Sequence, residues 1–231
     1  MTKNFKMVAK TLYGLEEILA QELRQLGASN IEIGVRNVSF EGDTGFMYKA
    51  NLCCRTAIKI LKPITAFNVF KEEDLYQKVY NINWQQYMDV KGSLAVDATV
   101  FSDYFKHSQY IALKTKDAIV DRFRDMEGER PNVDLDHPTL RINIHIDRNI
   151  CTVSLDSSGQ SLHKRGYKVA NTLAPINEVL AAGMILKAGW TGQSDFIDPM
   201  CGGGTLLAEA AMIACNIPVN LNKEEFGFET W

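Results

Sequence analysis

The chain contains the stretch Phe196-Ile197-Asp198-Pro199-Met200-Cys201-Gly202-Gly203-Gly204-Thr205, which predicts a short buried strand joined to a helix by three consecutive glycines. Glycine adopts positive φ angles and lets the main chain approach a ligand that any Cβ would block. The helix predicted over residues 205–215 follows at once, so its unpaired N–H groups face the same place. The stretch therefore indicates a loop that can hold an anion or the polar edge of a nucleoside.

The spacing of these glycines narrows the choice of ligand. It matches neither the G-x-x-x-x-G-K-[ST] pattern of phosphate-binding loops nor the G-x-G-x-x-G pattern of dinucleotide-binding folds. The alternative is that three glycines only turn a tight corner between strand and helix. The Asp198-Pro199 pair in front of them favours a binding loop.

The run from Asp198 to Thr205, followed by an alanine-rich helix, resembles the first motif of S-adenosylmethionine-dependent RNA methyltransferases. Two upstream segments resemble the region that leads into this domain in the THUMP-containing members, Leu162-His163-Lys164-Arg165-Gly166-Tyr167 and Ala174-Pro175-Ile176-Asn177-Glu178. The chain from Met1 onward is similar to the amino-terminal part of these enzymes, which include 23S rRNA guanine-N2 methyltransferases and proteins often labelled N6-adenine-specific DNA methylases. The resemblance implies that S-adenosylmethionine is the cofactor and that it is bound by Asp198, Pro199, Met200, Cys201, Gly202, Gly203, Gly204 and Thr205.

Composition and charge are those of an ordinary globular protein. Of the 231 residues 46% are hydrophobic and 23% charged, and no apolar run reaches signal or membrane-spanning length. We therefore expect a cytoplasmic protein without membrane contact. The net charge of −3 is unlike that of a strongly basic nucleic-acid binder. Residues 1–168 nevertheless carry 23 basic against 21 acidic side chains, so phosphate contacts are expected there rather than in residues 169–231.

Cysteines and histidines give no sign of a metal or disulfide framework. The five cysteines contain no C-x-x-C pair, and the four histidines have no metal-ligand spacing. Cys201 lies in the glycine loop but has no histidine or other base near it in sequence. The resemblance places it in the cofactor loop rather than in the chemistry.

Residues 1–63 predict a ferredoxin-like α+β unit. Strands are expected at residues 7–10, 31–35 and 38–40, helices at 14–26 and 44–54, and a last apolar run at 57–61 that stops at Pro63.

Residues 64–156 predict a second α/β unit. Helices are expected at 72–80 and 108–124, a half-buried strand at 94–100, and a hairpin of strands 140–146 and 150–155. This order of helix, strand, helix, strand, strand resembles a THUMP domain, a module for binding RNA.

Residues 157–231 predict the beginning of an α/β, Rossmann-like methyltransferase domain, with a turn-rich link and a helix at 176–187 before the glycine loop. A doubly wound sheet needs about five or more strands covered on both faces. One strand and its flanking helices cannot bury their own apolar faces. We expect an amino-terminal fragment whose methyltransferase domain continues beyond Trp231; the alternative is that residues 196–197 join a sheet supplied by something else.

Two groups of cations are candidate RNA contacts. The first opens or lies along the helix at 108–124, where side-chain cations and helix N–H groups can hold a phosphate, namely Lys106, His107, Lys114 and Lys116. Because aspartates interleave with them, a solvated helix face with i,i+4 pairs is the alternative. The second group is His163, Lys164 and Arg165, which with Tyr167 can clamp a phosphate and stack on a base, or form a plain interdomain turn.

The resemblance implies methyl transfer to an exocyclic nitrogen of an extruded base, with catalysis mainly by proximity and orientation. The Asn-Pro-Pro-aromatic tetrapeptide of the family is absent, so no catalytic residue is assigned in this chain. We expect a parent enzyme that methylates RNA, first of all 23S rRNA at guanine N2, with tRNA as the alternative RNA, and a 231-residue chain that is inactive alone. The alternatives are a fragment of a DNA adenine-N6 methyltransferase and a stand-alone THUMP-type RNA-binding module without catalysis.

Overall fold

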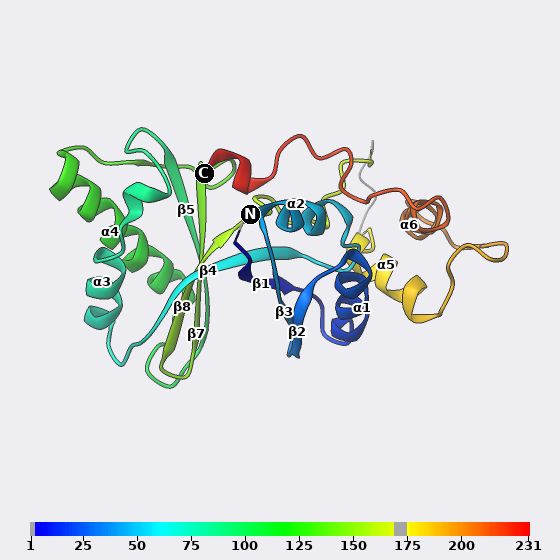
Figure 1. Cartoon of the computed structure of the whole chain (residues 1–231), viewed down its shortest axis with the longest axis horizontal. Helices are drawn as coiled ribbons and strands as arrows, with labels where there is room; N and C mark the ends of the chain where they lie inside the picture. Colours follow the sequence, from blue (N-terminus) through cyan, green and yellow to red (C-terminus); the bar gives the residue numbers. More distant parts are fainter. Residues whose placement is uncertain (1–2, 169–174) are drawn as a thin grey trace. The chain divides into compact units, whose positions relative to one another are not determined.

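The computed structural model describes residues 3–168 and 175–231, so Ala174 of the linker resemblance lies outside it. Its contacts define two compact units (Figure 1). The first unit comprises Met1–Ile60 and Gln160–Phe226, and the second Leu61–Gly159 and Gly227–Trp231. Segments that the sequence assigns to a first and a third domain therefore share one unit, and the three-part division by residue number stays a prediction.

In the first unit an antiparallel sheet in the order β2-β3-β1 is covered by helices. Helix α1 ends at Gly27, whose φ of 104° allows its N–H to close the last turn on Leu23 and Arg24. Asp43 caps the next helix by accepting the N–H of Phe46. The elements are β1 (Phe5–Lys10), α1 (Glu16–Leu26), β2 (Ser29–Gly34), β3 (Asn37–Gly42) and α2 (Thr44–Cys53).

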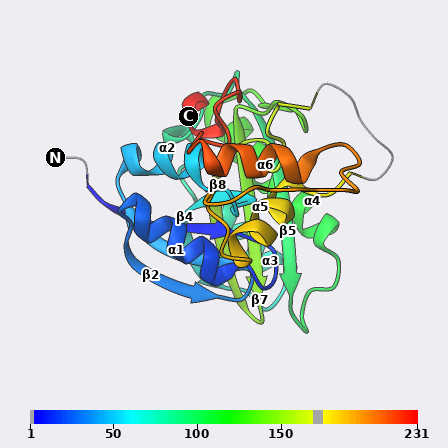
Figure 2. The same ribbon diagram turned by 90° about the vertical axis from the view of Figure 1, so that its right-hand side faces the viewer.

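Two further helices of the first unit, α5 (Glu178–Lys187) and α6 (Thr205–Ala214), pack against each other, and α5 also contacts α1 (Figure 2). A Cβ on Gly183 would lie 2.5 Å from Cδ1 of the buried Leu15, so a larger residue here would have to displace that side chain. Asn177 caps α5 by accepting the N–H groups of Val179 and Leu180. The helix that follows the glycine loop is therefore attached to the front of the chain through α5.

The second unit is a mixed sheet in the order β4-β8-β7-β5-β6, with antiparallel pairs β4/β8 and β8/β7 and parallel pairs β7/β5 and β5/β6. Helix α4 provides the crossover between the parallel strands β5 and β7. The elements are β4 (Lys59–Asn68), α3 (Glu72–Tyr80), η1 (Trp84–Gln86), β5 (Ser93–Phe101), α4 (Ser108–Glu127), β6 (Asn132–Val133), β7 (Leu140–Asp147), β8 (Ile150–Asp156) and η2 (Gly227–Thr230).

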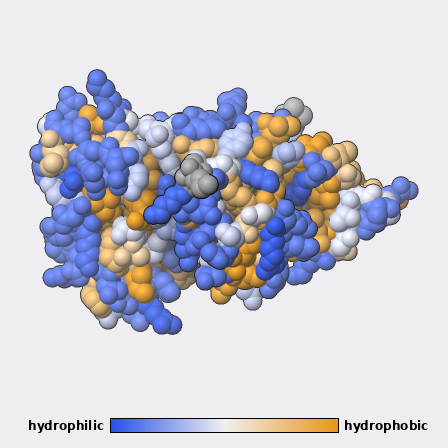
Figure 3. All heavy atoms as spheres, viewed as in Figure 1, coloured by the Kyte–Doolittle hydropathy of each residue, from blue (hydrophilic) through white to orange (hydrophobic). Residues whose placement is uncertain are grey.

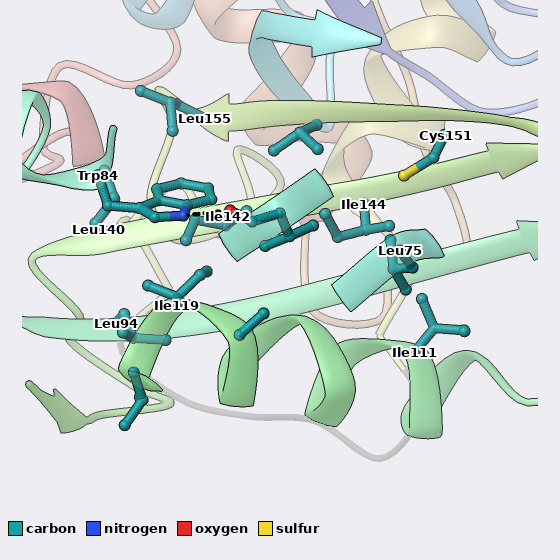
Figure 4. Packing of buried hydrophobic residues seen from close by; sticks show 14 of the residues in the cluster. Leu75, Trp84, Leu94, Ile111, Ile119, Leu140, Ile142, Ile144, Cys151 and Leu155 are labelled. Atoms are coloured by element: carbon teal, nitrogen blue, oxygen red, sulfur yellow. Dashed lines mark hydrogen bonds between the residues drawn. The ribbon is translucent and has the colours of Figure 1, made fainter. Parts of the chain in front are cut away.

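The core of the second unit lies between one face of this sheet and the helices (Figure 4). Ile142, Ile144 and Ile146 are fully buried, whereas the side chains between them along β7 are only half-buried on the other face. Trp84 is buried and its indole N–H donates to the carbonyl of Val79 at 2.9 Å. No helix in the described part of the chain is long and apolar enough to cross a membrane.

The predicted helices and the predicted hairpin are confirmed to within a few residues at their ends. The predicted stop at Pro63 is wrong, because β4 continues to Asn68. Its pairing with β8 shifts register between Pro63 and Thr65. A proline cannot donate to a ladder but is tolerated at such a bulge, so it does not end the strand.

Tyrosine–carboxylate hydrogen bonds join α3 to α4, with Tyr76 donating to Asp121 at 2.7 Å and Tyr80 to Asp125 at 3.0 Å. The hydrogen bond to Asp121, with burial, raises the pKa of Tyr76 from 10.0 to about 12. The neutral phenol therefore stabilises the fold fully below pH 10, and this contribution is lost as the pH rises toward 12.

We expect the urea midpoint of the wild-type chain to fall more steeply between pH 10 and pH 12 than that of Tyr76→Phe, which lacks this titration. Urea unfolding followed by circular dichroism at each pH measures it. Tyr13→Phe is the control, because Tyr13 is 76% exposed and should leave the wild-type slope unchanged. Equal slopes for wild type and Tyr76→Phe would contradict the coupling.

Candidate functional site

The glycine loop has a defined local geometry. The Asp198 carboxylate accepts the N–H of Met200 at 3.1 Å, and the N–H of Gly204 donates to the carbonyl of Cys201 at 2.7 Å. Gly202 and Gly204 have φ angles of 51° and 74°, which favour glycine. Gly204 is the N-cap residue of α6, so the tight turn leads directly into the helix.

The segment before the loop does not form the predicted strand. Phe196 and Ile197 have no strand conformation, and Ile197 is 83% exposed. Phe196 packs on Trp190, with ring centroids 5.0 Å apart. A strand requires a hydrogen-bonded neighbour, and within residues 3–168 and 175–231 no strand pairs with this segment. The prediction of a buried strand here is corrected to a segment without strand structure, in which Phe196 is half-buried and Ile197 is exposed.

The space beside the loop is open. A Cβ built on Gly202 or Gly204 would meet no described atom within 4 Å, and Met200 is 90% exposed. Gly204 has no side chain to accept a hydrogen bond from the first turn of α6, so these N–H groups remain for a ligand. Such a cradle fits a nucleoside cofactor. Of the predicted cofactor residues, Asp198 and Gly204 are half-buried, Thr205 is buried, and the exposed ones are Pro199, Met200, Cys201, Gly202 and Gly203.

A buried ion pair fixes the helix behind the loop. Nε of Arg165 lies 3.5 Å from Oε1 of Glu209, and both side chains are completely buried. Tyr167 donates its hydroxyl to the same carboxylate oxygen at 3.2 Å. The Arg165 guanidinium also donates to the carbonyls of Leu162 at 2.6 Å and Arg55 at 2.5 Å. Glu209 lies one turn after Thr205, so this pair sets the position of the first turn of α6.

The polar network extends to α1. The Arg55 guanidinium donates to the carbonyls of Met212 at 3.2 Å, near the C-terminal end of α6, and of Ile217 at 3.0 Å, just beyond that end. The carboxylate of Glu22, on α1, accepts the backbone N–H groups of Arg55 and Thr56 at 2.8 and 3.0 Å. Burial raises the pKa of Glu22 and of Glu209 and lowers that of Arg55. Arg55, which is itself held by Glu22 of α1, thus anchors the C-terminal part of α6, the helix that follows the glycine loop.

Apolar surface surrounds these helices. A pocket of 260 Å³ lies against α6, lined mostly by apolar side chains, including Ala208, Met212 and Val219, and by the Tyr167 ring. Hydrophobic side chains also lie at the surface over α5 and α6 (Figure 3), and among them Met184 and Leu207 are 47% and 38% exposed. This pattern is typical of helices that further elements of an α/β domain cover.

The first group of candidate RNA contacts consists of two exposed residues before α4 and two residues on α4 that are paired with carboxylates. Lys106 and His107 are exposed in the segment that leads into α4. Lys114 lies 4.0 Å from Glu73 and over the ring of Tyr76, and Lys116 lies 2.6 Å from Asp117. The two cations on the helix itself are thus paired, although neither pair is the i,i+4 pair of the alternative interpretation.

For the second group of candidate RNA contacts, His163, Lys164 and Arg165, the structure differs more from the prediction. Arg165 is 1% exposed and engaged with Glu209, so its interpretation as a phosphate clamp is replaced by a structural role. His163 lies 2.7 Å from the Ser161 hydroxyl, and burial lowers its pKa, which leaves the ring neutral at pH 7. Lys164 is exposed. The signal that sequence reasoning missed was Glu209, a carboxylate inside an alanine-rich apolar helix, because such a group needs a buried partner.

Three domain models match the chain in succession. The RlmL ferredoxin-like domain matches residues 6–61, the THUMP domain residues 70–156, and the RMKL-like methyltransferase domain residues 165–230. This is the organisation expected for the amino-terminal part of a THUMP-containing RNA methyltransferase. The resemblance inferred from the glycine loop and the linker is therefore confirmed.

Comparison with individual proteins gives the same result as the domain models. The ribosomal RNA large subunit methyltransferase K/L of Syntrophotalea carbinolica is 41% identical over 235 residues, which are 100% of this chain and 33% of that protein. The crystal structure of a predicted N6-adenine-specific DNA methylase from Listeria monocytogenes is similar with a TM-score of 0.85 and 31% identity, covering 99% of this chain and 60% of that one. SMU.472 complexed with SAH is similar with a TM-score of 0.84 and 33% identity, covering 100% and 61%. The chain thus spans a third of the length of the curated relative.

Replacing Glu209 by Gln leaves the Arg165 charge buried without a counter-ion, so we expect a loss of about 3–5 kcal/mol in unfolding free energy. The double variant Arg165→Met/Glu209→Gln should recover part of it, because no buried charge remains. Urea unfolding of wild type, the single variants Arg165→Met and Glu209→Gln, and the double variant measures the coupling.

The matched control is Glu32→Gln, because Glu32 also lies 3.5 Å from its cation, Lys6, but in a pair whose side chains are 75% and 57% exposed. It should cost less than about 1 kcal/mol. An effect of Glu209→Gln as small as that of Glu32→Gln would show that the buried pair does not fix α6.

Proposed function

We propose that the full-length protein is an S-adenosylmethionine-dependent methyltransferase of large-subunit ribosomal RNA, acting on guanine N2. This chain contributes the RNA-binding front and the first part of the cofactor site. The observation that carries the proposal is the open glycine cradle at the start of α6, which follows a THUMP-type unit in the chain. The name of the Syntrophotalea relative and the SAH bound to SMU.472 support it.

In this proposal the residues of the loop bind and orient rather than react. The cofactor supplies a methyl group already activated on its sulfonium. Gly202 and Gly204 let the backbone approach it, the first turn of α6 offers N–H groups, and the Asp198 carboxylate orients the loop or accepts from the amino group of the methionine moiety. Pro199, Met200, Cys201, Gly203 and Thr205 complete the proposed cofactor segment.

The remaining assignments are proposals on the same basis. Residues 1–63 form the ferredoxin-like domain, 64–156 the THUMP domain and 157–231 the start of the methyltransferase domain. The rest of that domain, beyond Trp231, supplies the catalytic residues. An enzyme acting on ribosomal RNA would work in the cytoplasm. The proposed RNA contacts keep Lys106, His107, Lys114, Lys116, His163 and Lys164, and leave out Arg165.

A second candidate function is methylation of adenine N6 in DNA, which the name of the Listeria relative favours. The same cofactor loop would serve either acceptor. The THUMP match at residues 70–156 argues for RNA.

We expect Gly204→Ala to weaken S-adenosylmethionine binding by the full-length protein at least about tenfold, because a Cβ would enter the cradle and strain a φ of 74°. Gly128→Ala is the matched control, since Gly128 has a φ of 78°, equally open surroundings and a place at the end of α4. Both should lose about 1 kcal/mol of stability from the strained backbone. Calorimetric titration measures the affinity, and equal affinities for the two variants would refute the cradle.

Methyl transfer to 23S rRNA, tRNA and duplex DNA by the full-length protein should be detected chiefly on rRNA. Incorporation of labelled methyl groups measures it, and mapping of the product identifies the base. Transfer to DNA alone would establish the second candidate function. The 231-residue chain alone should give no turnover. Turnover by this chain would contradict the proposal that the catalytic residues lie beyond Trp231.

A further inference from the structure

A group of exposed hydrophobic side chains of the second unit lies at one end of its sheet. Strand register places Phe101, Asp147, Ile150 and Asn68 in one row across β5, β7, β8 and β4. Phe70 follows β4 and Tyr104 follows β5. We call this group the aromatic end, and its exposed members are Phe70 at 53%, Phe101 at 63%, Tyr104 at 58% and Ile150 at 50%.

Backbone hydrogen bonds hold the three segments of the aromatic end together. The N–H of Val69 donates to Asn149 at 2.7 Å and that of Arg148 to Phe101 at 2.6 Å. The Ser102 hydroxyl donates to the carbonyl of Arg148 and accepts the N–H of Tyr104. The exposed rings are therefore carried on ordered turns at the end of a sheet.

Two of the rings contact each other without being covered. Phe70 and Tyr104 pack edge to face, with centroids 5.6 Å apart and planes at 89°, while more than half of each side chain is exposed. An edge-to-face pair leaves ring surface open to a third flat group. Every nucleobase has a face that stacks on such a ring.

Basic groups lie in the same segments. Lys71, Lys106, His107 and Arg148 are all exposed. Of the nearby carboxylates, Asp74 accepts the N–H groups of Phe70 and Lys71, and Glu72 accepts the Tyr110 hydroxyl. The exposed acids Asp103 and Asp147 also lie in these segments, so both signs of charge are present and neither dominates. Exposed rings flanked by cations fit a polyanion that carries flat bases.

We propose that the aromatic end binds unpaired nucleotides of RNA, with a base stacked on Phe70 and Tyr104 and the adjoining phosphates near Lys106 and Arg148. A base inside a duplex is stacked on its neighbours and does not present a free face, so a loop, bulge or single-stranded end is the substrate. The proposal deepens the proposed function, on which it rests for RNA as the acceptor. It adds rings to the first group of candidate RNA contacts, Lys106, His107, Lys114 and Lys116, which contains basic side chains alone.

The test measures the affinity of the full-length protein for a fluorescein-labelled single-stranded RNA of about 10 nucleotides and for the duplex of the same sequence. Phe70→Ala/Tyr104→Ala should weaken single-strand binding about 10- to 100-fold and duplex binding much less. Tyr104→Phe, which keeps the ring, should bind like wild type. Val133→Ala/Leu135→Ala is the control, because these side chains are 50% and 70% exposed away from the aromatic end, and it should bind like wild type.

The fluorescence of a base analogue in the single strand should be quenched when the RNA binds to wild type, because the base stacks on the rings. It should not be quenched when the RNA binds to the double variant. Quenching reports stacking directly, whereas a change in protein stability alone does not alter it. Phe70→Leu, which keeps an apolar side chain, covers the case in which the double variant unfolds and should also lose quenching. Unchanged single-strand affinity of the double variant would overturn the proposal and would indicate that the exposed rings bind a protein instead. Equal losses of affinity for single strand and duplex would also overturn it. Methyl transfer by wild type, measured in parallel, shows separately whether the proposed function holds.

Discussion

The buried contact between Arg165 and Glu209 is the interaction on which the candidate cofactor site depends. Two charges removed from water are tolerated when they compensate each other and hydrogen bonds from neighbouring groups satisfy part of their remaining capacity. Here Arg165 comes from the linker and Glu209 from the centre of α6, and carbonyls of Leu162 and Arg55 accept from the guanidinium. Linker and helix are thereby held in one arrangement. The contact between Arg165 and Glu209, one turn into α6, therefore determines where the glycine loop at the start of this helix lies.

Sequence reasoning succeeded where structure is determined locally. The helix at Glu72–Tyr80 was predicted with these bounds, because Leu75 and Val79 mark one face and acidic residues open the first turn. The hairpin around residues 147–149 was equally visible from alternation and turn residues. The identity of the cofactor came from resemblance, since the spacing of the three glycines alone left the ligand open.

What the sequence did not reveal depends on distant partners. Residues 196–197 have the composition of a strand, but a strand exists only when a neighbour pairs with it. Arg165 looked like a surface cation because its counter-ion lies 44 positions further along the chain, in a different helix. Exposure of Phe70 and Tyr104 was likewise invisible, since aromatic residues are more often buried than presented to solvent. In each case the decisive fact was a contact, or its absence, far away in sequence.

The first unit is built from two pieces of chain, Met1–Ile60 and Gln160–Phe226, separated by most of the second unit. On a ribosome the front piece emerges about a hundred residues before its complement, at roughly 5–20 residues per second. During these seconds Leu15 lacks Gly183, and Arg55 lacks the carbonyls of α6. The second unit, whose sheet is almost complete by Gly159, can acquire its core in that interval. Synthesis therefore imposes an order in which the inserted unit closes first and the helix behind the glycine loop docks last.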